Sequence, residues 1–331
     1  MTRRVVVAYG GSLETAAASA ALASRIGAEI ATVTLDLGQG ADLEQVREHA
    51  LAAGAVRAHV VDARRELAAD VIRPALVAGA FDSSSHALAV TRPIIARHLV
   101  AVARMEGATA VGHGAAGEDR VRLERLLATL APELTIHALA DEAVAMGRGG
   151  VAQHLWARVV TGVPSAGRPG LYARTSAPAG LAAHPAVVAL TLERGVPVAV
   201  NGVSLELDAL IEVIDTIAGD HGVGRFETAC DGVSSLVEAP AAVVLGAAAQ
   251  ALAAAALPAD LVARRAQVAS AFGSLIADGG WHTPTRTALD DFTGACADSL
   301  TGTVTLELAS GECRVLDCAV EVTSTPAVAY S

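Results

Sequence analysis

The stretch Arg4-Val5-Val6-Val7-Ala8-Tyr9-Gly10-Gly11-Ser12-Leu13-Glu14-Thr15 decides how the start of this chain folds. Its run of valines is typical of a buried parallel strand. The glycine pair lets the backbone turn sharply and approach a ligand, and the alanine-rich residues that follow favour a helix. A helix N-terminus placed directly after a strand offers unpaired N–H groups to phosphate. An ordinary turn without a ligand is the alternative, and the absence of lysine excludes a Walker A loop.

Further strands alternate with helices along the first half of the chain. Residues 29–35, 57–61 and 109–114 read as strands, and residues 42–53 and the segment from Arg92 read as helices. This alternation predicts an α/β fold with a parallel sheet, helices on both faces and ligands at the carboxyl ends of the strands. Asp36 lies at such an end, either as a ligand residue or as the cap of the next helix. His113 is either a buried core histidine or a site residue.

Composition narrows the class of protein. The chain has 331 residues, of which 53% are hydrophobic, so it is long enough for two domains with cores. A net charge of −11 disfavours nucleic-acid binding, which needs a basic face. No apolar run or leader predicts a membrane span or a secretory signal, so we expect a cytoplasmic protein. The cysteines lack CxxC spacing and predict neither a zinc site nor disulfides.

The second half has a different pattern. Residues 164–185 are rich in Pro, Gly, Ser and Ala without periodicity, which predicts a domain boundary between residues 1–165 and 166–331. Residues 187–193 and 196–201 read as a hairpin, 205–218 as an amphipathic helix, and 304–308 with 312–316 as another hairpin. The second domain is therefore expected to be a smaller α+β unit.

The opening stretch resembles the pyrophosphatase loop of the argininosuccinate synthase family, within the N-type ATP pyrophosphatases. That loop reads Ala-Tyr-Ser-Gly-Gly-Leu-Asp-Thr-Ser, and here Gly10, Ser12, Glu14 and Ala16 replace its first Ser, second Gly, Asp and last Ser. The resemblance continues in order along both halves, at Asp36 to Gly40, Arg92 to Ala96, His113-Gly114, Ala115 to Glu124, His221 to Arg225, Glu238 to Ala241, Gly280 to Pro284, Ala288 to Asp290 and Thr301 to Val304.

This resemblance implies a fold and a set of site residues. The fold is a Rossmann-like (HUP) nucleotide-binding domain followed by a synthetase domain, and the ligands are ATP and Mg²⁺, with Glu14 as the metal ligand. Catalytic residues carried over are Glu14, Thr15 and Asp119. Residues carried over for ATP are Ala8, Tyr9, Gly10, Gly11, Ser12, Glu14, Thr15, Leu35 and Gly114. Residues carried over for the substrates are Ser84, Gly117, Glu118, Asp119 and Arg122.

The positions that match the family's substrate contacts have changed most. Ala116 and Glu118 replace a threonine and an asparagine that hold aspartate, although Glu118 and Asp119 also read simply as an acidic helix start. The family's contacts to citrulline fall on small or apolar residues, namely Ser84, Leu88, Gly150, Val159, Thr161, Cys230 and Val237. We therefore expect an acceptor less polar than citrulline.

Three functions follow from the resemblance. The leading expectation is an ATP-dependent carbon–nitrogen ligase of specialised metabolism that adenylates a carbonyl or ureido oxygen and uses an amino-acid-like amine. The second is a weak or inactive homologue kept as a partner-binding subunit, and the third is a genuine argininosuccinate synthase. The chain stops without the family's long C-terminal helix, so we expect a homo-oligomer smaller than a tetramer, namely a dimer.

Overall fold

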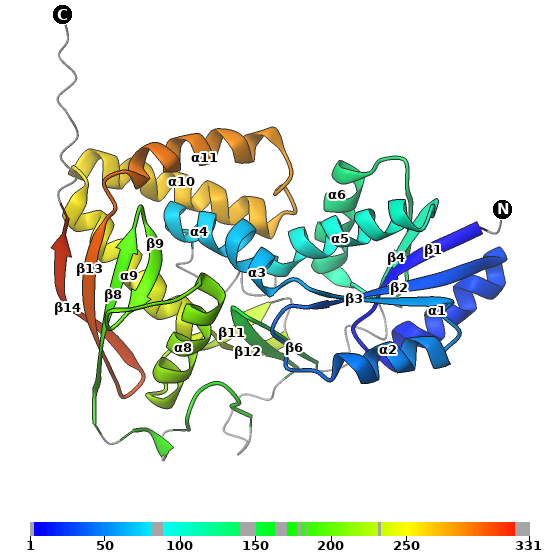
Figure 1. The fold of residues 1–331 in the computed structure, drawn as a ribbon, viewed down its shortest axis with the longest axis horizontal. Coiled ribbons are helices and arrows are strands. Elements are labelled where there is room, and N and C mark those ends of the chain that lie inside the picture. The colour runs from blue at the N-terminus through cyan, green and yellow to red at the C-terminus, as the bar shows by residue number, and fades with distance from the viewer. Residues whose placement is uncertain are drawn as a thin grey trace, which may run out of the picture.

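The structure is a computed structural model that describes residues 3–80, 89–139, 150–162, 171–177, 180–182, 184–230 and 233–321. A parallel sheet lies at one end of the molecule and an antiparallel sheet at the other, with helices between and around them (Figure 1). The expected boundary near residue 165 falls outside the described residues. In the described part of the chain, no helix is both long and apolar enough to cross a bilayer.

The first sheet is parallel throughout, as predicted. Its strand order is β3-β2-β1-β4-β5. The strands are β1 (Arg3–Ala8), β2 (Ala28–Asp36), β3 (Arg57–Asp62), β4 (Ala110–His113) and β5 (Thr135–Ala138). The chain order reverses between β1 and β4, so their carboxyl ends form the crevice in which α/β proteins bind ligands.

Helices cover both faces of this sheet because the strands are apolar on both sides. Val5 and Val7 pack with Leu22 of α1 (Leu13–Ile26), whereas Val6 joins a core that includes Ile94 of α5 (Arg92–Met105). The other helices of this half are α2 (Leu43–Ala52), α3 (Arg64–Leu67), a π-helical turn (Ala68–Ile72), α4 (Arg73–Ala78), a 3₁₀ turn (Ala89–Thr91) and α6 (Gly117–Leu130).

The second half contains an antiparallel sheet with the order β10-β9-β8-β13-β14. Both predicted hairpins are present: β8 (Ala186–Glu193) with β9 (Val196–Val200), and β13 (Gly302–Ala309) with β14 (Glu312–Val320). The short β10 (Val203–Ser204) completes the sheet. The helices of this half are α8 (Leu207–Asp220), α9 (Pro240–Ala256), α10 (Ala259–Ala277) and α11 (Pro284–Ala297).

A third, four-stranded antiparallel sheet has the order β11-β12-β7-β6 and was not predicted. Its strands are β6 (Val151–His154), β7 (Ala157–Thr161), β11 (Arg225–Cys230) and β12 (Val233–Glu238). Because β7 pairs with β12, this sheet joins segments that lie far apart in the sequence. It places the β6–β7 hairpin against the loop that follows β2, where the Leu155 N–H donates to the Leu37 carbonyl at 2.5 Å.

Candidate active site

The main cavity, with a volume of about 500 Å³, lies at the carboxyl ends of β1, β2 and β4. Its floor comes from the parallel sheet and its far wall from β6. It is lined by Ala8, Tyr9, Gly10, Ser12, Thr15, Val33, Leu35, Leu37, Gln39, Thr91, Arg92, Ile95, His113, Gly114, Ala115, Ala116, Asp119, Leu123, Val151, Ala152, Gln153 and His154. This is the position at which doubly wound sheets bind ligands.

The turn after β1 opens α1 towards this cavity. Gly11 has φ of 92°, a conformation that favours glycine. Ser12 caps the helix, since its Oγ accepts from the Thr15 N–H at 3.1 Å and donates to Thr15 Oγ1 at 2.9 Å. The first N–H groups of α1 beyond this cap are therefore positioned for an anion at the mouth of the cavity.

Gly114 faces this turn from the end of β4. A Cβ atom placed on Gly114 would lie 2.8 Å from Thr15 Oγ1, closer than real Cβ contacts come. An alanine here would force the Thr15 side chain to move, so glycine lets the strand end and the helix start approach closely with the Thr15 hydroxyl in place. Together, Gly10 to Thr15 and Gly114 form a narrow cradle of backbone and hydroxyl groups, which suits a phosphate chain.

His113 lies at the base of the cavity and is almost fully buried. Its Nδ1 accepts from the Ala115 N–H at 3.3 Å, and its Nε2 lies 3.6 Å from Glu124 Oε1, beyond hydrogen-bond distance. Burial lowers the pKa of His113, and the nearby Glu124 carboxylate only partly opposes this effect. His113 is therefore a neutral imidazole whose Nε2 carries the proton and can donate one hydrogen bond.

Two arginines hold Asp119 at the opposite wall. Arg92 makes a bidentate pair with it, at 2.7 Å to Oδ1 and 2.6 Å to Oδ2, and Arg122 Nη1 lies 3.2 Å from Oδ1. Burial disfavours the charge, but the arginines outweigh it, so the pKa of Asp119 is lowered. A carboxylate held in this way stays ionised and is a poor general base. From the sequence, Arg92 was recognised only as part of a helix motif, and its pairing with Asp119 was not predicted.

The other residues selected from the sequence occupy different positions. Glu14 is exposed on the first turn of α1, and Glu118 is exposed on the first turn of α6, 3.9 Å from Arg122. Gly11, Glu14, Gly117, Glu118 and Arg122 are absent from the residues that line the cavity. Ser84 and Leu88 lie outside the described residues. The far wall, residues 151–154, was also missed, because strand β6 carries no glycine or charge pattern to mark it.

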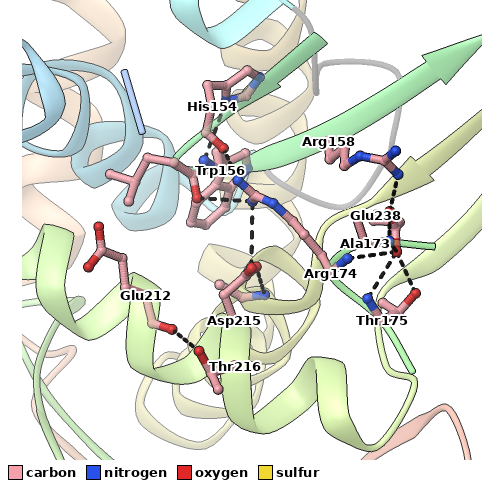
Figure 2. Close-up of polar contacts among 12 residues, drawn as sticks. His154, Trp156, Arg158, Ala173, Arg174, Thr175, Glu212, Asp215, Thr216 and Glu238 are labelled. Carbon is pink, nitrogen blue, oxygen red and sulfur yellow. Dashed lines mark hydrogen bonds and ion pairs between the residues drawn. The ribbon is translucent and has the colours of Figure 1, made fainter. Parts of the chain in front are cut away.

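A buried polar network supports that far wall from behind (Figure 2). Arg174 donates to the His154 carbonyl at 2.5 Å and to the Leu155 carbonyl at 3.4 Å, and it lies 3.6 Å from Asp215 of α8. Glu238 accepts from the backbone N–H groups of residues 173–175 and from Arg158. The network thus fixes residues 171–177 and, through Arg174, the turn between β6 and β7.

Comparisons with known proteins give matches to one family along most of the chain. Residues 4–153 match the model "Arginosuccinate synthase N-terminal HUP domain", and residues 158–323 match "Arginosuccinate synthase C-terminal domain". The argininosuccinate synthase of Rubrobacter xylanophilus is 35% identical over 95% of this chain and 85% of its own, and that of Dehalococcoides mccartyi is 35% identical over 96% and 86%. A solved NAD⁺ synthetase from Burkholderia pseudomallei is similar at 22% identity over 42% of this chain and 54% of that chain, with a TM-score of 0.28. The chain belongs to the argininosuccinate synthase family.

Proposed function

We propose that this protein is an ATP-dependent carbon–nitrogen ligase whose acceptor is less polar than citrulline. The acceptor's carbonyl or ureido oxygen attacks the α-phosphorus of ATP and pyrophosphate leaves; an amine nitrogen then attacks the activated carbon and AMP leaves. Members of the argininosuccinate synthase family are ATP-dependent ligases. Such chemistry depends on positioning and on donors for the departing pyrophosphate more than on acid–base residues.

The phosphate cradle supports the nucleotide part of this proposal. Ser12 and Thr15 line the cavity with hydroxyl groups, and Gly10 and Gly114 leave the backbone open to a ligand. Ala8, Tyr9 and Leu35 line the same cavity beside the cradle, where they form an apolar surface for the nucleoside. We therefore place ATP across the carboxyl ends of β1, β2 and β4.

Mg²⁺ fits this site only if phosphate and water supply most of its ligands. Among the described residues, no group of three His, Cys, Asp or Glu side chains is arranged to hold a metal ion. Mg²⁺ commonly takes one or two carboxylates plus substrate phosphates, so Glu14, exposed beside the cradle, is sufficient as a protein ligand. When bound, the ion would offset the charge of the departing pyrophosphate.

The observation that carries the acceptor proposal is an apolar row across the third sheet. Ala152, which lines the cavity, pairs with Val159, and Val159 pairs with Val237. Val159 and Val237 are buried in a small cluster with Ala157 and Ala239. These valines occupy positions where the family resemblance expects a serine and a tyrosine. Ala152 is the member of this row that reaches the cavity, and the two valines pack behind it. A citrulline polar group left without a partner at this wall would cost about 1–3 kcal/mol.

The amine substrate is expected to resemble an amino acid. Asp119 keeps lone pairs for an ammonium group, and Arg92, which lines the cavity beside it, offers a positive group that suits a carboxylate. We propose that Asp119 orients the amine and that Thr15 contacts the phosphate chain.

The test is release of pyrophosphate and AMP from ATP across a panel of carbonyl acceptors and amines. We expect turnover with acceptors less polar than citrulline and little with citrulline and aspartate. Val159→Ser places a hydroxyl on the apolar row and is expected to raise citrulline-dependent release, whereas Val187→Ser, an exposed change on β8 outside the residues that line the cavity, is the control. The acceptor proposal fails if citrulline is the best acceptor, or if Val159→Ser raises citrulline-dependent release no more than Val187→Ser does.

Genuine argininosuccinate synthesis is the second candidate, because the two relatives described above carry that name at 35% identity over nearly the whole chain. Rapid formation of argininosuccinate, identified by mass spectrometry, would select this candidate. A protein that binds no ATP and releases no pyrophosphate with any acceptor would instead be an inactive homologue.

A further inference from the structure

The turn between α10 and α11 lies against the first turn of α5 (Figure 1). This turn, residues 278–283, contains the Gly-Trp-His stretch noted in the sequence, to which the proposed function gives no role. His282 Nε2 donates to the Pro93 carbonyl at 3.3 Å. Pro93 directly follows Arg92, which makes the bidentate pair with Asp119. The turn therefore reaches the helix that supplies one of the two arginines that hold Asp119.

Arg122, the second of those arginines, joins the end of α10 to α6. Its Nε donates to the carbonyl of Ala277, the last residue of α10, and its Nη1 donates to Asp119 Oδ1 at 3.2 Å. The last carbonyls of a helix lack intrahelical partners and carry a partial negative charge, so they suit a guanidinium. A Cβ atom placed on Gly279, whose φ is 71°, would collide with the Arg122 carbonyl. The turn therefore touches the backbone of the residue whose side chain holds Asp119.

The turn is held in one arrangement by its own packing. The Trp281 ring is buried, meets the Phe272 ring edge-on with the ring centres 5.6 Å apart, and lies under the Arg286 guanidinium at 3.7 Å. Both kinds of contact favour a defined position of the ring. The Gly280 N–H also donates to the Leu275 carbonyl at 2.8 Å, which ties the turn back to α10. The turn is therefore a firm support for the helices that it touches.

Arg122 itself stands behind the wall of the main cavity. Arg92 and Asp119 line the cavity, whereas Arg122 is not among the lining residues. Its side chain is 13% exposed, and besides its bonds to Ala277 and Asp119 it lies 3.9 Å from Glu118. The family resemblance implies that Arg122 contacts a substrate, but its guanidinium is directed at other groups of the protein. Arg122 can therefore influence a substrate through Asp119.

We propose that Arg122 is a positioning residue, through which the turn between α10 and α11 sets the place of the Asp119 carboxylate in the main cavity. The role of Asp119 as the group that orients the amine rests on the proposed function. Arg92 holds both carboxylate oxygens from α5, and Arg122 holds Oδ1 while it is anchored on α10. The second half of the chain thereby fixes a side chain that belongs to the first half.

Two pairs of variants of the full chain test this role. Arg125, one turn farther along α6, donates to the Asp278 carbonyl at 3.2 Å. Arg122→Met and Arg125→Met therefore each remove a bond to the end of α10, but only Arg122→Met removes a bond to Asp119. Gly279→Ala pushes the turn against α6, whereas Gly294→Ala on α11 adds a methyl group in open space. Thermal unfolding establishes that each variant folds.

The first measurement needs no ligand. Carboxyl ¹³C NMR of protein labelled in its aspartates reports on the Asp119 side chain, and Asp119→Asn identifies its signal. Arg122→Met and Gly279→Ala are expected to shift this signal, although Gly279 acts on Asp119 only through α6. Arg125→Met and Gly294→Ala are expected to leave the signal in place.

The second measurement uses the acceptor and amine that give the fastest pyrophosphate release in the panel described above. Arg122→Met should raise the KM for the amine about tenfold and change kcat little, because a charged hydrogen bond behind the amine site is lost. Its affinity for ATP, measured by calorimetry, should stay the same. Arg125→Met should alter none of these values.

Several outcomes would overturn the positioning role. It fails if Gly279→Ala leaves the Asp119 carboxyl signal where Gly294→Ala does. It also fails if Arg122→Met and Arg125→Met raise the KM for the amine equally, which would mean that both arginines only dock α6 on α10. A protein that releases no pyrophosphate with any pair of substrates would refute the proposed function instead, and the carboxyl signal would still decide the role of Arg122.

Discussion

Replacing Asp215 by asparagine is expected to stabilise the protein at neutral pH, although it removes one half of an ion pair. Asp215 is largely buried on α8, 3.6 Å from Arg174, and its Oδ1 accepts from the Ala241 N–H at 3.4 Å (Figure 2). Burial raises the pKa of Asp215 to about 6, and the carboxylates of Glu238 and Glu212 add to this effect, while Arg174 opposes it. Burial also lowers the pKa of Arg174. Desolvation thus outweighs the attraction within the pair.

The sign of the pH dependence follows from this raised pKa. The ordinary value is 3.8, so the folded protein holds this proton more tightly than the unfolded chain does. The contribution of Asp215 to stability is most favourable below pH 4, and it is lost as the pH rises through about 6. At 1.36 kcal/mol for each pKa unit, the cost at pH 8 is about 3 kcal/mol. Asparagine keeps the hydrogen-bond acceptor and avoids this cost.

The assay is thermal unfolding of both proteins between pH 4 and pH 8. At pH 8 we expect Asp215→Asn to raise the Tm by about 4 °C, a shift that matches about 3 kcal/mol for a chain of this length. The difference should shrink as the pH falls below 6. Asp220→Asn, an exposed change at the end of the same helix, is the control and should alter the Tm little. A lower Tm for Asp215→Asn at pH 8, or a difference independent of pH, would refute the reasoning.

Three further predictions concern the network and the cradle. Arg174→Met removes the donors to the His154 and Leu155 carbonyls, so it should lower the free energy of unfolding by about 3–5 kcal/mol, measured by urea denaturation. An unchanged midpoint of the urea unfolding curve would contradict this. Gly114→Ala should weaken ATP binding about tenfold by calorimetry, because its Cβ crowds Thr15 Oγ1, and unaltered affinity would show that the cradle does not hold phosphate. Glu14→Ala should weaken ATP binding in Mg²⁺ but little in EDTA, and equal losses in both would remove Glu14 from the metal site.

Much of the fold could be predicted because its signals are local. The valine run of β1, the glycine turn and the alanine-rich helix lie together in the sequence, and both hairpins of the second half surround tight turns that glycine marks. The β6–β7 hairpin was missed because its strands are short and its turn, Leu155-Trp156, contains no turn-forming residue. Its partner β12 lies about 75 residues farther along the chain, and such pairing leaves no local pattern.

The same distinction between local and non-local signals applies to the residues of the candidate site. Ser12, Thr15 and Gly114 were selected from local motifs, and all line the main cavity. Arg92 was not selected, because its importance depends on Asp119, which reaches it only through the packing of α5 against α6. The role of Glu238 is equally non-local, since its carboxylate organises backbone N–H groups more than 60 positions earlier in the chain.

The two walls of the main cavity are built by different parts of the fold, and this separation explains how one can change without the other. The proposed phosphate cradle is built on the close approach of Gly114 to Thr15 at the switch point of the parallel sheet. The far wall is carried by β6, which is held from outside by Arg174 and by pairing with β7. The row from Ala152 to Val237 lies on the third sheet and shares no residue with the cradle. Under the proposed function, substitutions in this row can therefore change the acceptor while the residues proposed to hold ATP stay in place.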